Sequence, residues 1–131
     1  FFYDQLGVHP YAGGRGEGYD PRLEAGQRDV EAGFGVKDMT FRGLDRLREQ
    51  VYEDEGIWRD VVIGEFGYDA TPGNWYYVAE PTRATYLAEA LRQAGAWDWV
   101  TAFTVYTGEG FAIDGTPADE ALRQATARLR E

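Results

Sequence analysis

The chain has 131 residues, 44% of them hydrophobic, which is enough for one domain of ordinary size. It carries 23 Asp and Glu residues against 13 Lys and Arg residues, and the net charge of -10 disfavours nucleic acid and anionic membrane surfaces as partners. Having no cysteine and a single histidine, the sequence excludes disulfides, thiolate metal sites and multi-histidine metal sites.

The first predicted strand covers Asp4–His9 and is followed by a long, glycine-rich loop over residues 12–38. Loops of that length in compact domains are usually functional or disordered. The first helix is predicted over Thr40–Glu55, and Gly56 follows it as a natural stop. Its apolar residues recur every three or four positions and define a buried face: Phe41, Leu44, Leu47 and Val51.

The second strand is predicted over Asp60–Phe66, a nearly continuous apolar run. The loop that follows it, residues 67–80, carries an aromatic trio at positions 75–77. The second helix begins near Pro81, a favourable first-turn residue, and is expected to end at Gly95. Its inner stripe consists of Tyr86, Leu87, Ala90, Leu91 and Ala94.

The third strand is predicted over Trp99–Tyr106. The third helix opens with "TPADE", in which Thr116 can cap the first turn, Pro117 fits that turn and Asp119 can return the capping bond. Its apolar face consists of Leu122, Ala125 and Leu129.

Strand and helix thus alternate three times, which is the pattern of an α/β fold with parallel strands joined by right-handed crossovers. Parallel sheets are usually covered on both faces, and the apolar second strand agrees with such cover. Long loops follow the strands, whereas the returns from helix to strand are short. We therefore expect the long loops to gather at the carboxyl ends of the strands, where α/β proteins bind their ligands.

Polar and aromatic residues stand at all three predicted strand ends. His9 and Tyr11 close the first strand, Glu65 the second and Tyr106 the third. Glu65 interrupts the apolar run "VVIGEFGY", and burying an unpaired carboxylate costs several kcal/mol, so its position requires a partner or a function. These side chains are expected to line a pocket at one rim of the sheet. On spacing alone, Glu65 could equally be a structural carboxylate paired with a nearby arginine.

Three stretches together resemble a known enzyme family: "DQLGVHPYAGG", "DVVIGEFGY" and "WVTAFTVYTGEG". They are similar to the last three strand-helix units of the clan A glycoside hydrolases, with families 39 and 5 the nearest, and the similarity covers essentially the whole chain. The resemblance implies that residues 1–131 are a single partial domain, strands and helices 6–8 of a TIM-type (β/α)8 barrel. It also implies hydrolysis of O-glycosidic bonds in oligo- or polysaccharides with retention of anomeric configuration.

The resemblance also implies roles for individual residues. In this clan, a glutamate in the context [TG]-E-[FY]-G at the end of strand seven is the catalytic nucleophile, which corresponds to Glu65. An H-x-Y pattern after strand six implies that His9 and Tyr11 line the subsite where cleavage occurs. Strand eight usually offers a tryptophan beneath the sugar ring, and this sequence departs from that pattern with Tyr106, which could equally belong to the core. Trp75 could stack on a sugar or pack beneath its own loop.

One catalytic group of the clan is missing from the sequence. The acid/base residue lies in an Asn-Glu pair at strand four, and no such dipeptide occurs here, where Asn74 is the one asparagine. A complete barrel takes roughly 250 residues. The chain also begins at Phe1 without a recognisable signal peptide, so we expect a piece of a longer protein.

The expected partners are therefore a carbohydrate substrate and the remainder of the barrel. We expect the 131-residue chain alone to be inactive. The implied mechanism requires no cofactor and no metal. Secretion is what the resemblance to polysaccharide-degrading enzymes suggests, and no apolar run is long enough to cross a bilayer.

Two other classes of function remain open. A barrel remnant that keeps the aromatic rim would bind carbohydrate without catalysis. An unrelated small α/β domain, such as a flavodoxin-like one, would need a cofactor-binding loop after the first strand. The segment "HPYAGGRGEG" is glycine-rich at that place but matches neither a P-loop nor a dinucleotide-binding fingerprint.

Overall fold

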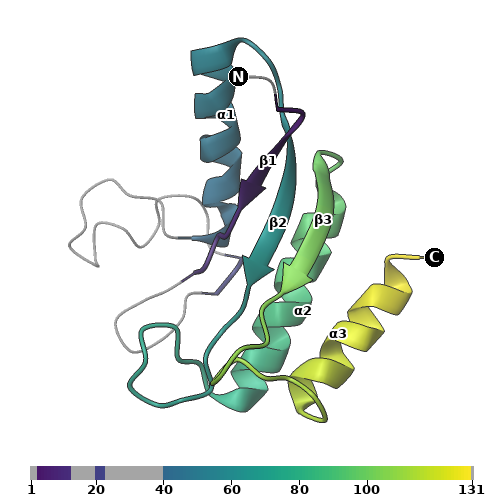
Figure 1. Cartoon of the computed structure of the whole chain (residues 1–131). Coiled ribbons are helices and arrows are strands. Elements are labelled where there is room, and N and C mark those ends of the chain that lie inside the picture. Colours follow the sequence, from purple (N-terminus) through teal and green to yellow (C-terminus); the bar gives the residue numbers. More distant parts are fainter. Residues whose placement is uncertain (1–2, 13–19, 23–39, 131) are drawn as a thin grey trace.

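The computed structural model describes residues 3–12, 20–22 and 40–130. Most of the loop predicted over residues 12–38 therefore lies outside the described residues. Strands and helices alternate along the chain (Figure 1), with these bounds: β1 Gln5–Val8, η1 Phe41–Gly43, α1 Leu44–Glu55, β2 Asp60–Phe66, α2 Glu80–Ala96, β3 Val100–Val105 and α3 Pro117–Arg128. The prediction of three strand-helix units is confirmed, although β1 and β3 are each one residue shorter at both ends than predicted.

The strands form one parallel sheet whose spatial order, β1-β2-β3, is also their order in the chain. Leu6 stands opposite Val61, and Ile63 stands opposite Phe103. All three strands run the same way in Figure 1, so the segments that follow them meet at one end of the sheet. The predicted parallel sheet is confirmed, and the described loops after β2 and β3 lie together at the carboxyl ends of the strands.

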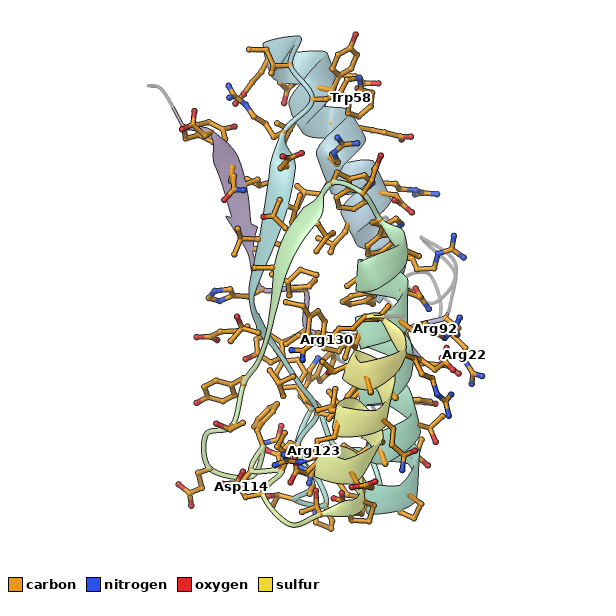
Figure 2. The ribbon with its side chains drawn as sticks, turned by 90° about the vertical axis from the view of Figure 1, so that its right-hand side faces the viewer. Arg22, Trp58, Arg92, Asp114, Arg123 and Arg130 are labelled. Atoms are coloured by element: carbon orange, nitrogen blue, oxygen red, sulfur yellow. The ribbon has the colours of Figure 1, made fainter. Side chains whose placement is uncertain are left out.

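The core lies between the sheet and the helices. Figure 2 shows the strands on one side of the molecule and the helices on the other. The central strand β2 contributes its helix-facing side chains, and the helices contribute an apolar face each. The most deeply buried apolar side chains are Ala12, Phe41, Val61, Ile63, Phe66, Tyr68, Leu87, Ala90, Ala94 and Ala118.

The opposite face of the sheet is open among the described residues. Gln5 and Gly7 of β1 are exposed, as are Ala102 and Thr104 of β3, while Val62 of β2 is half-buried. Cover on both faces was therefore a wrong prediction for the part of the chain that the structure describes. Adjacent parallel strands joined by crossovers of one hand place every helix on the same side, which explains why one face stays uncovered. Parallel sheets rarely leave a face open in this way.

Helix α2 passes through Gly95 instead of ending there. It continues to Ala96, and Trp97, with an extended backbone, follows as its cap. A Cβ placed on Gly95 would lie 2.7 Å from Cδ2 of Leu129, so the glycine allows α3 to pack closely against α2. The predicted stop is wrong because close helix packing, not a left-handed turn, requires this glycine. By contrast, Gly56 has φ of 73° and ends α1 as predicted.

The capping box predicted at the start of α3 does not form. Thr116 is the N-cap residue, but its hydroxyl donates to the carbonyl of Ile113 at 2.6 Å. The carboxylate of Asp119 accepts a hydrogen bond from Nε of Arg123 at 2.9 Å. Oδ2 of Asp119 accepts from the amide of Gly115 at 3.4 Å, one residue before the cap, while the Thr116 amide donates to the carbonyl of Ile113 at 2.9 Å. The box does not form because the Thr116 amide already has this partner.

Two leucines predicted on buried helix faces are exposed. Leu47 of α1 is exposed, and so is Leu129, which follows α3. Leu129 still covers Gly95, whereas Leu47 lines an open groove beside β1. The helical pattern identified the correct face of α1 for Phe41 and Leu44, which are buried, but not how far along the helix the core extends.

Ile63 provides a test of the assigned core. Its side chain is fully buried, so Ile63→Ala should lower the free energy of unfolding by about 2–5 kcal/mol, because contacts are lost and a cavity remains. Ile57 is exposed and serves as the matched control, for which the same substitution should change stability by less than about 0.5 kcal/mol. Urea denaturation followed by circular dichroism measures both, and equal losses would contradict this core.

Candidate functional site

An extra residue in β2 determines where Glu65 points. Between the pairs Ile63–Phe103 and Phe66–Val105, β2 advances by three residues while β3 advances by two. Strict alternation from the buried Ile63 would turn Glu65 into the core and Phe66 out of it. With the extra residue, Phe66 is fully buried and the Glu65 side chain stays 41% exposed. Bulges of this kind re-aim single side chains and are over-represented beside active sites.

Glu65 is held through one of its carboxylate oxygens, Oε2. The Tyr11 hydroxyl donates a hydrogen bond to this atom at 3.0 Å, and Nδ1 of His9 lies 3.5 Å from it. The three residues that sequence reasoning grouped at two strand ends therefore meet. Within the described part of the chain, the partners found for Glu65 are a phenol and an imidazole, not the arginine that a purely structural pairing would need.

The free-energy cost of burying the Glu65 carboxylate, which its place in an apolar run suggested, is small in the structure. Its carboxylate is partly hydrated, and the neighbouring His9 side chain is 55% exposed. The hydrogen bond from Tyr11 supplies a polar partner for one carboxylate oxygen. Glu65 is thus an accessible, paired carboxylate, which agrees with a group that must reach a ligand.

The backbone after β1 and a glycine in β2 bring His9 and Tyr11 to Glu65. The Tyr11 amide donates to the carbonyl of His9 at 2.9 Å, closing a tight turn around Pro10. A Cβ on Gly64 would lie 3.0 Å from Nε2 of His9, so the glycine gives the imidazole room to lie across β2. Gly64 was not predicted as a site residue, because its role depends on a contact between two strands.

Tyr11 lies within an aromatic cluster that surrounds its ring. Four ring centroids are close to its own: Tyr76 at 5.3 Å, Phe111 at 5.9 Å, Tyr106 at 6.3 Å and Phe66 at 6.5 Å. Burial raises the pKa of Tyr11, and its hydrogen bond to Glu65 raises it further. The phenol therefore stays protonated near neutral pH and can act as a donor to the carboxylate.

The rings that pack on Tyr11 include the predicted rim residue Tyr106 and others that were not predicted. Tyr106 meets the Tyr11 ring edge-on and remains exposed, as a rim residue would. Trp75 is half-buried in the loop after β2, and its neighbour Tyr76 packs on Tyr11. Tyr76 and Phe111 were not predicted as site residues. The trio at positions 75–77 indicated an aromatic contact from this loop, but the backbone of the loop decides which ring turns inward.

A groove of about 860 Å³ opens beside this cluster. Its lining comes from the end of β1, from η1 and α1, and from the loop after β2; His9, Tyr11, Leu44, Leu47 and Tyr76 contribute to it. Glu65 is not among the lining residues, so the groove adjoins the carboxylate on the side of β1. Its size is in the range of small-molecule sites.

Metal ligation and membrane insertion have no visible counterpart in the described ranges. Within residues 3–12, 20–22 and 40–130, no three His, Asp or Glu side chains come close enough to hold a metal ion. No helix in these ranges combines the length and the apolar character needed to cross a membrane. The site consists of a carboxylate, a phenol and an imidazole beside an aromatic wall.

Tyr11→Phe should change the response of the protein to alkali. The pKa of Tyr11 is raised in the folded chain, so its contribution to stability is complete below about pH 10, the ordinary value, and falls above it as the unfolded phenol ionises. One such group removes up to about 1.4 kcal/mol per pH unit. Tyr11→Phe should therefore flatten the alkaline decline in the free energy of unfolding, measured by urea denaturation.

The matched control for this prediction is Tyr52→Phe, which removes an exposed phenol of α1. An identical alkaline decline in wild type and Tyr11→Phe would show that Tyr11 is not held as described.

Comparisons with protein-family models, with curated proteins and with solved structures find no match to this chain. Function is therefore inferred from the sequence motifs and from the contacts around Glu65.

Proposed function

We propose that the chain is the carboxy-terminal part of a retaining glycoside hydrolase in which Glu65 is the nucleophile. The observation that carries this proposal is the pairing of Glu65 Oε2 with the Tyr11 hydroxyl at 3.0 Å and with His9 Nδ1 at 3.5 Å. These contacts lie at the carboxyl ends of two adjacent parallel strands, where (β/α)8 barrels carry their catalytic residues. The same three residues form the motif that resembles clan A.

The topology supports a barrel origin over a flavodoxin-like sheet. A flavodoxin-like sheet begins with the strand order 2-1-3 and carries helices on both faces. Here the order is β1-β2-β3, and the helices lie on one side (Figure 2). In a barrel, every helix covers the outside and the other face of the sheet points inward. The open face, with Gly7 and Ala102 among its exposed residues, suits a packed barrel interior.

Glu65 fits the first step of the retaining mechanism. One of its oxygens would attack the anomeric carbon of the sugar and form a covalent glycosyl-enzyme, while the bond to the leaving oxygen breaks and that oxygen takes a proton from a carboxylic acid about 5 Å away. Water then releases the sugar with its original configuration. Tyr11 would keep Glu65 oriented before the attack, since its phenol donates to Oε2.

The proton donor for that step would come from outside this chain. The sequence has no Asn-Glu dipeptide, the context in which the clan carries its acid/base residue. The remainder of the barrel would also pair with the open edges of β1 and β3 and cover the exposed sheet face. The proposed partners are thus a carbohydrate substrate and the missing strand-helix units.

A carbohydrate-binding protein without catalysis is the second candidate. The absence of an Asn-Glu pair from the sequence favours it, because binding needs the aromatic rim but no proton donor. Tyr76 and Tyr106 supply that rim in either case. The two candidates differ in whether Glu65 reacts with a sugar.

Fluorosugar donors with a dinitrophenolate leaving group test the reactivity of Glu65. Such a leaving group departs without protonation, so a nucleophile can be glycosylated even where the acid is missing. We expect mass spectrometry to find one sugar attached to the peptide that contains Glu65, with no turnover of ordinary aryl glycosides. Donors of gluco, galacto, manno and xylo configuration should be compared.

Glu65→Gln should abolish this labelling, whereas Glu109→Gln, a matched change at the exposed carboxylate after β3, should leave it unchanged. Equal labelling of the wild-type and Glu65→Gln chains would contradict the assignment of the nucleophile. Turnover of an aryl glycoside by the isolated chain would contradict the inference that the proton donor lies elsewhere.

A further inference from the structure

Asp69 organises the loop between β2 and α2 from within. Asp69 is only 3% exposed, and its Oδ1 accepts a hydrogen bond from the amide of Thr71 at 2.6 Å. The Asp69 amide donates to the carbonyl of Tyr76, and the Asp69 carbonyl accepts from the amide of Val78, both at 2.9 Å. The loop therefore doubles back on Asp69, and the backbone of Tyr76 is fixed to it.

The Asp69 carboxylate also lies against the loop between β3 and α3. A Cβ on Gly110 would lie 2.6 Å from Oδ1 of Asp69 and 2.7 Å from Oδ2. Gly110 has φ of 79°, a conformation that favours glycine, and its carbonyl accepts from the amide of Ala70 at 2.8 Å. Only a residue without a side chain allows the two loops to approach in this way.

Arg83 holds the same loop two residues further along. This residue is 1% exposed, and its Nη2 donates to the carbonyl of Ala112 at 2.9 Å while pairing with Oε2 of Glu80 at 2.7 Å. Asp69 and Arg83 thus fix the residues on either side of Phe111. Because desolvation offsets much of the attraction within a buried ion pair, the pairing of Arg83 with Glu80 is weak evidence for a role in stability alone.

Phe111 connects the loop that Asp69 and Arg83 fix to the aromatic rings of the candidate site. Its ring meets Tyr11 edge-on at 5.9 Å and Tyr106 at 5.2 Å. A Cβ on Gly67 would lie 2.9 Å from Cδ1 of Phe111, so the ring is seated directly on the backbone that follows β2. Phe111 on one side and Tyr76 on the other leave the Tyr11 ring little freedom to turn from Glu65.

We propose that Asp69 and Arg83 are positioning residues: they fasten the loops after β2 and β3 so that Phe111 and Tyr76 hold the Tyr11 phenol on Glu65. The catalytic consequence rests on the proposed function, whereas the positioning of Tyr11 does not. The side chains of Asp69 and Arg83 bond to the loops after β2 and β3, so both residues act on Tyr11 through the aromatic rings between them.

The test uses the ring signals of Tyr11 in nuclear magnetic resonance spectra of the tyrosine-labelled chain, assigned by their loss in Tyr11→Phe. The surrounding rings should displace these signals from their unfolded values. Asp69→Ala and Arg83→Met should each move them toward the unfolded values while the chain stays folded. Because removing Arg83 alone leaves Glu80 without its ion pair, the double change Glu80→Gln, Arg83→Met is measured beside Arg83→Met, and circular dichroism verifies that each variant is folded.

Two matched controls separate positioning from a general effect of charge. Asp114→Ala removes an exposed carboxylate from the loop after β3, and Arg92→Met removes an exposed arginine from α2 that pairs with Glu89 as Arg83 does with Glu80 (Figure 2). Both should leave the Tyr11 signals in place. Unchanged Tyr11 signals in a folded Arg83→Met chain, or equal changes in the controls, would overturn the proposal.

A second readout distinguishes this proposal from the proposed function. If Glu65 reacts with the fluorosugar donors, Arg83→Met should slow that labelling by about tenfold to a hundredfold, the effect expected of a misplaced reacting group. If wild type shows no labelling, the proposed function fails, and the Tyr11 signals still decide whether Asp69 and Arg83 position the phenol.

Discussion

The hydrogen bond from Tyr11 to Glu65 is the interaction on which the functional interpretation depends. It joins the end of β1 to the end of β2 and exists because an extra residue in β2 turns Glu65 away from the core. Without that residue, the carboxylate would face the helices and require a buried partner. The strand irregularity thus converts a costly position into an accessible one, and Phe66 keeps the core filled.

The open sheet face and the candidate site follow from the same topological constraint. Parallel strands that are adjacent in the chain and in space bring their carboxyl ends together and send all the helices to one side. The first consequence places His9, Tyr11 and Glu65 within contact of one another. The second leaves Gly7 and Ala102 exposed on a face that a complete barrel would bury.

Local sequence patterns predicted the strand-helix order, the bounds of β2 and the grouping of His9, Tyr11 and Glu65, because periodicity and strand ends depend on nearby residues. The errors arose where distant contacts decide the outcome. Gly95 has the pattern of a helix stop but serves the packing of α3.

The same limit applies to the site. Nothing local distinguishes Trp75 from Tyr76. Nothing local marks Asp69 and Arg83 as buried either, since both lie against the loop after β3, which is distant along the chain. The resemblance to clan A supplied the role proposed for Glu65, which no periodicity contains.

The most direct measurement of the central claim is a sugar titration followed through the imidazole signals of His9, the single histidine of the chain. If Glu65 faces a sugar subsite, mono- and oligosaccharides that bind should shift the His9 signals in a saturable manner. Saturable binding of a sugar that leaves the His9 signals unchanged would place the carbohydrate elsewhere and contradict the account.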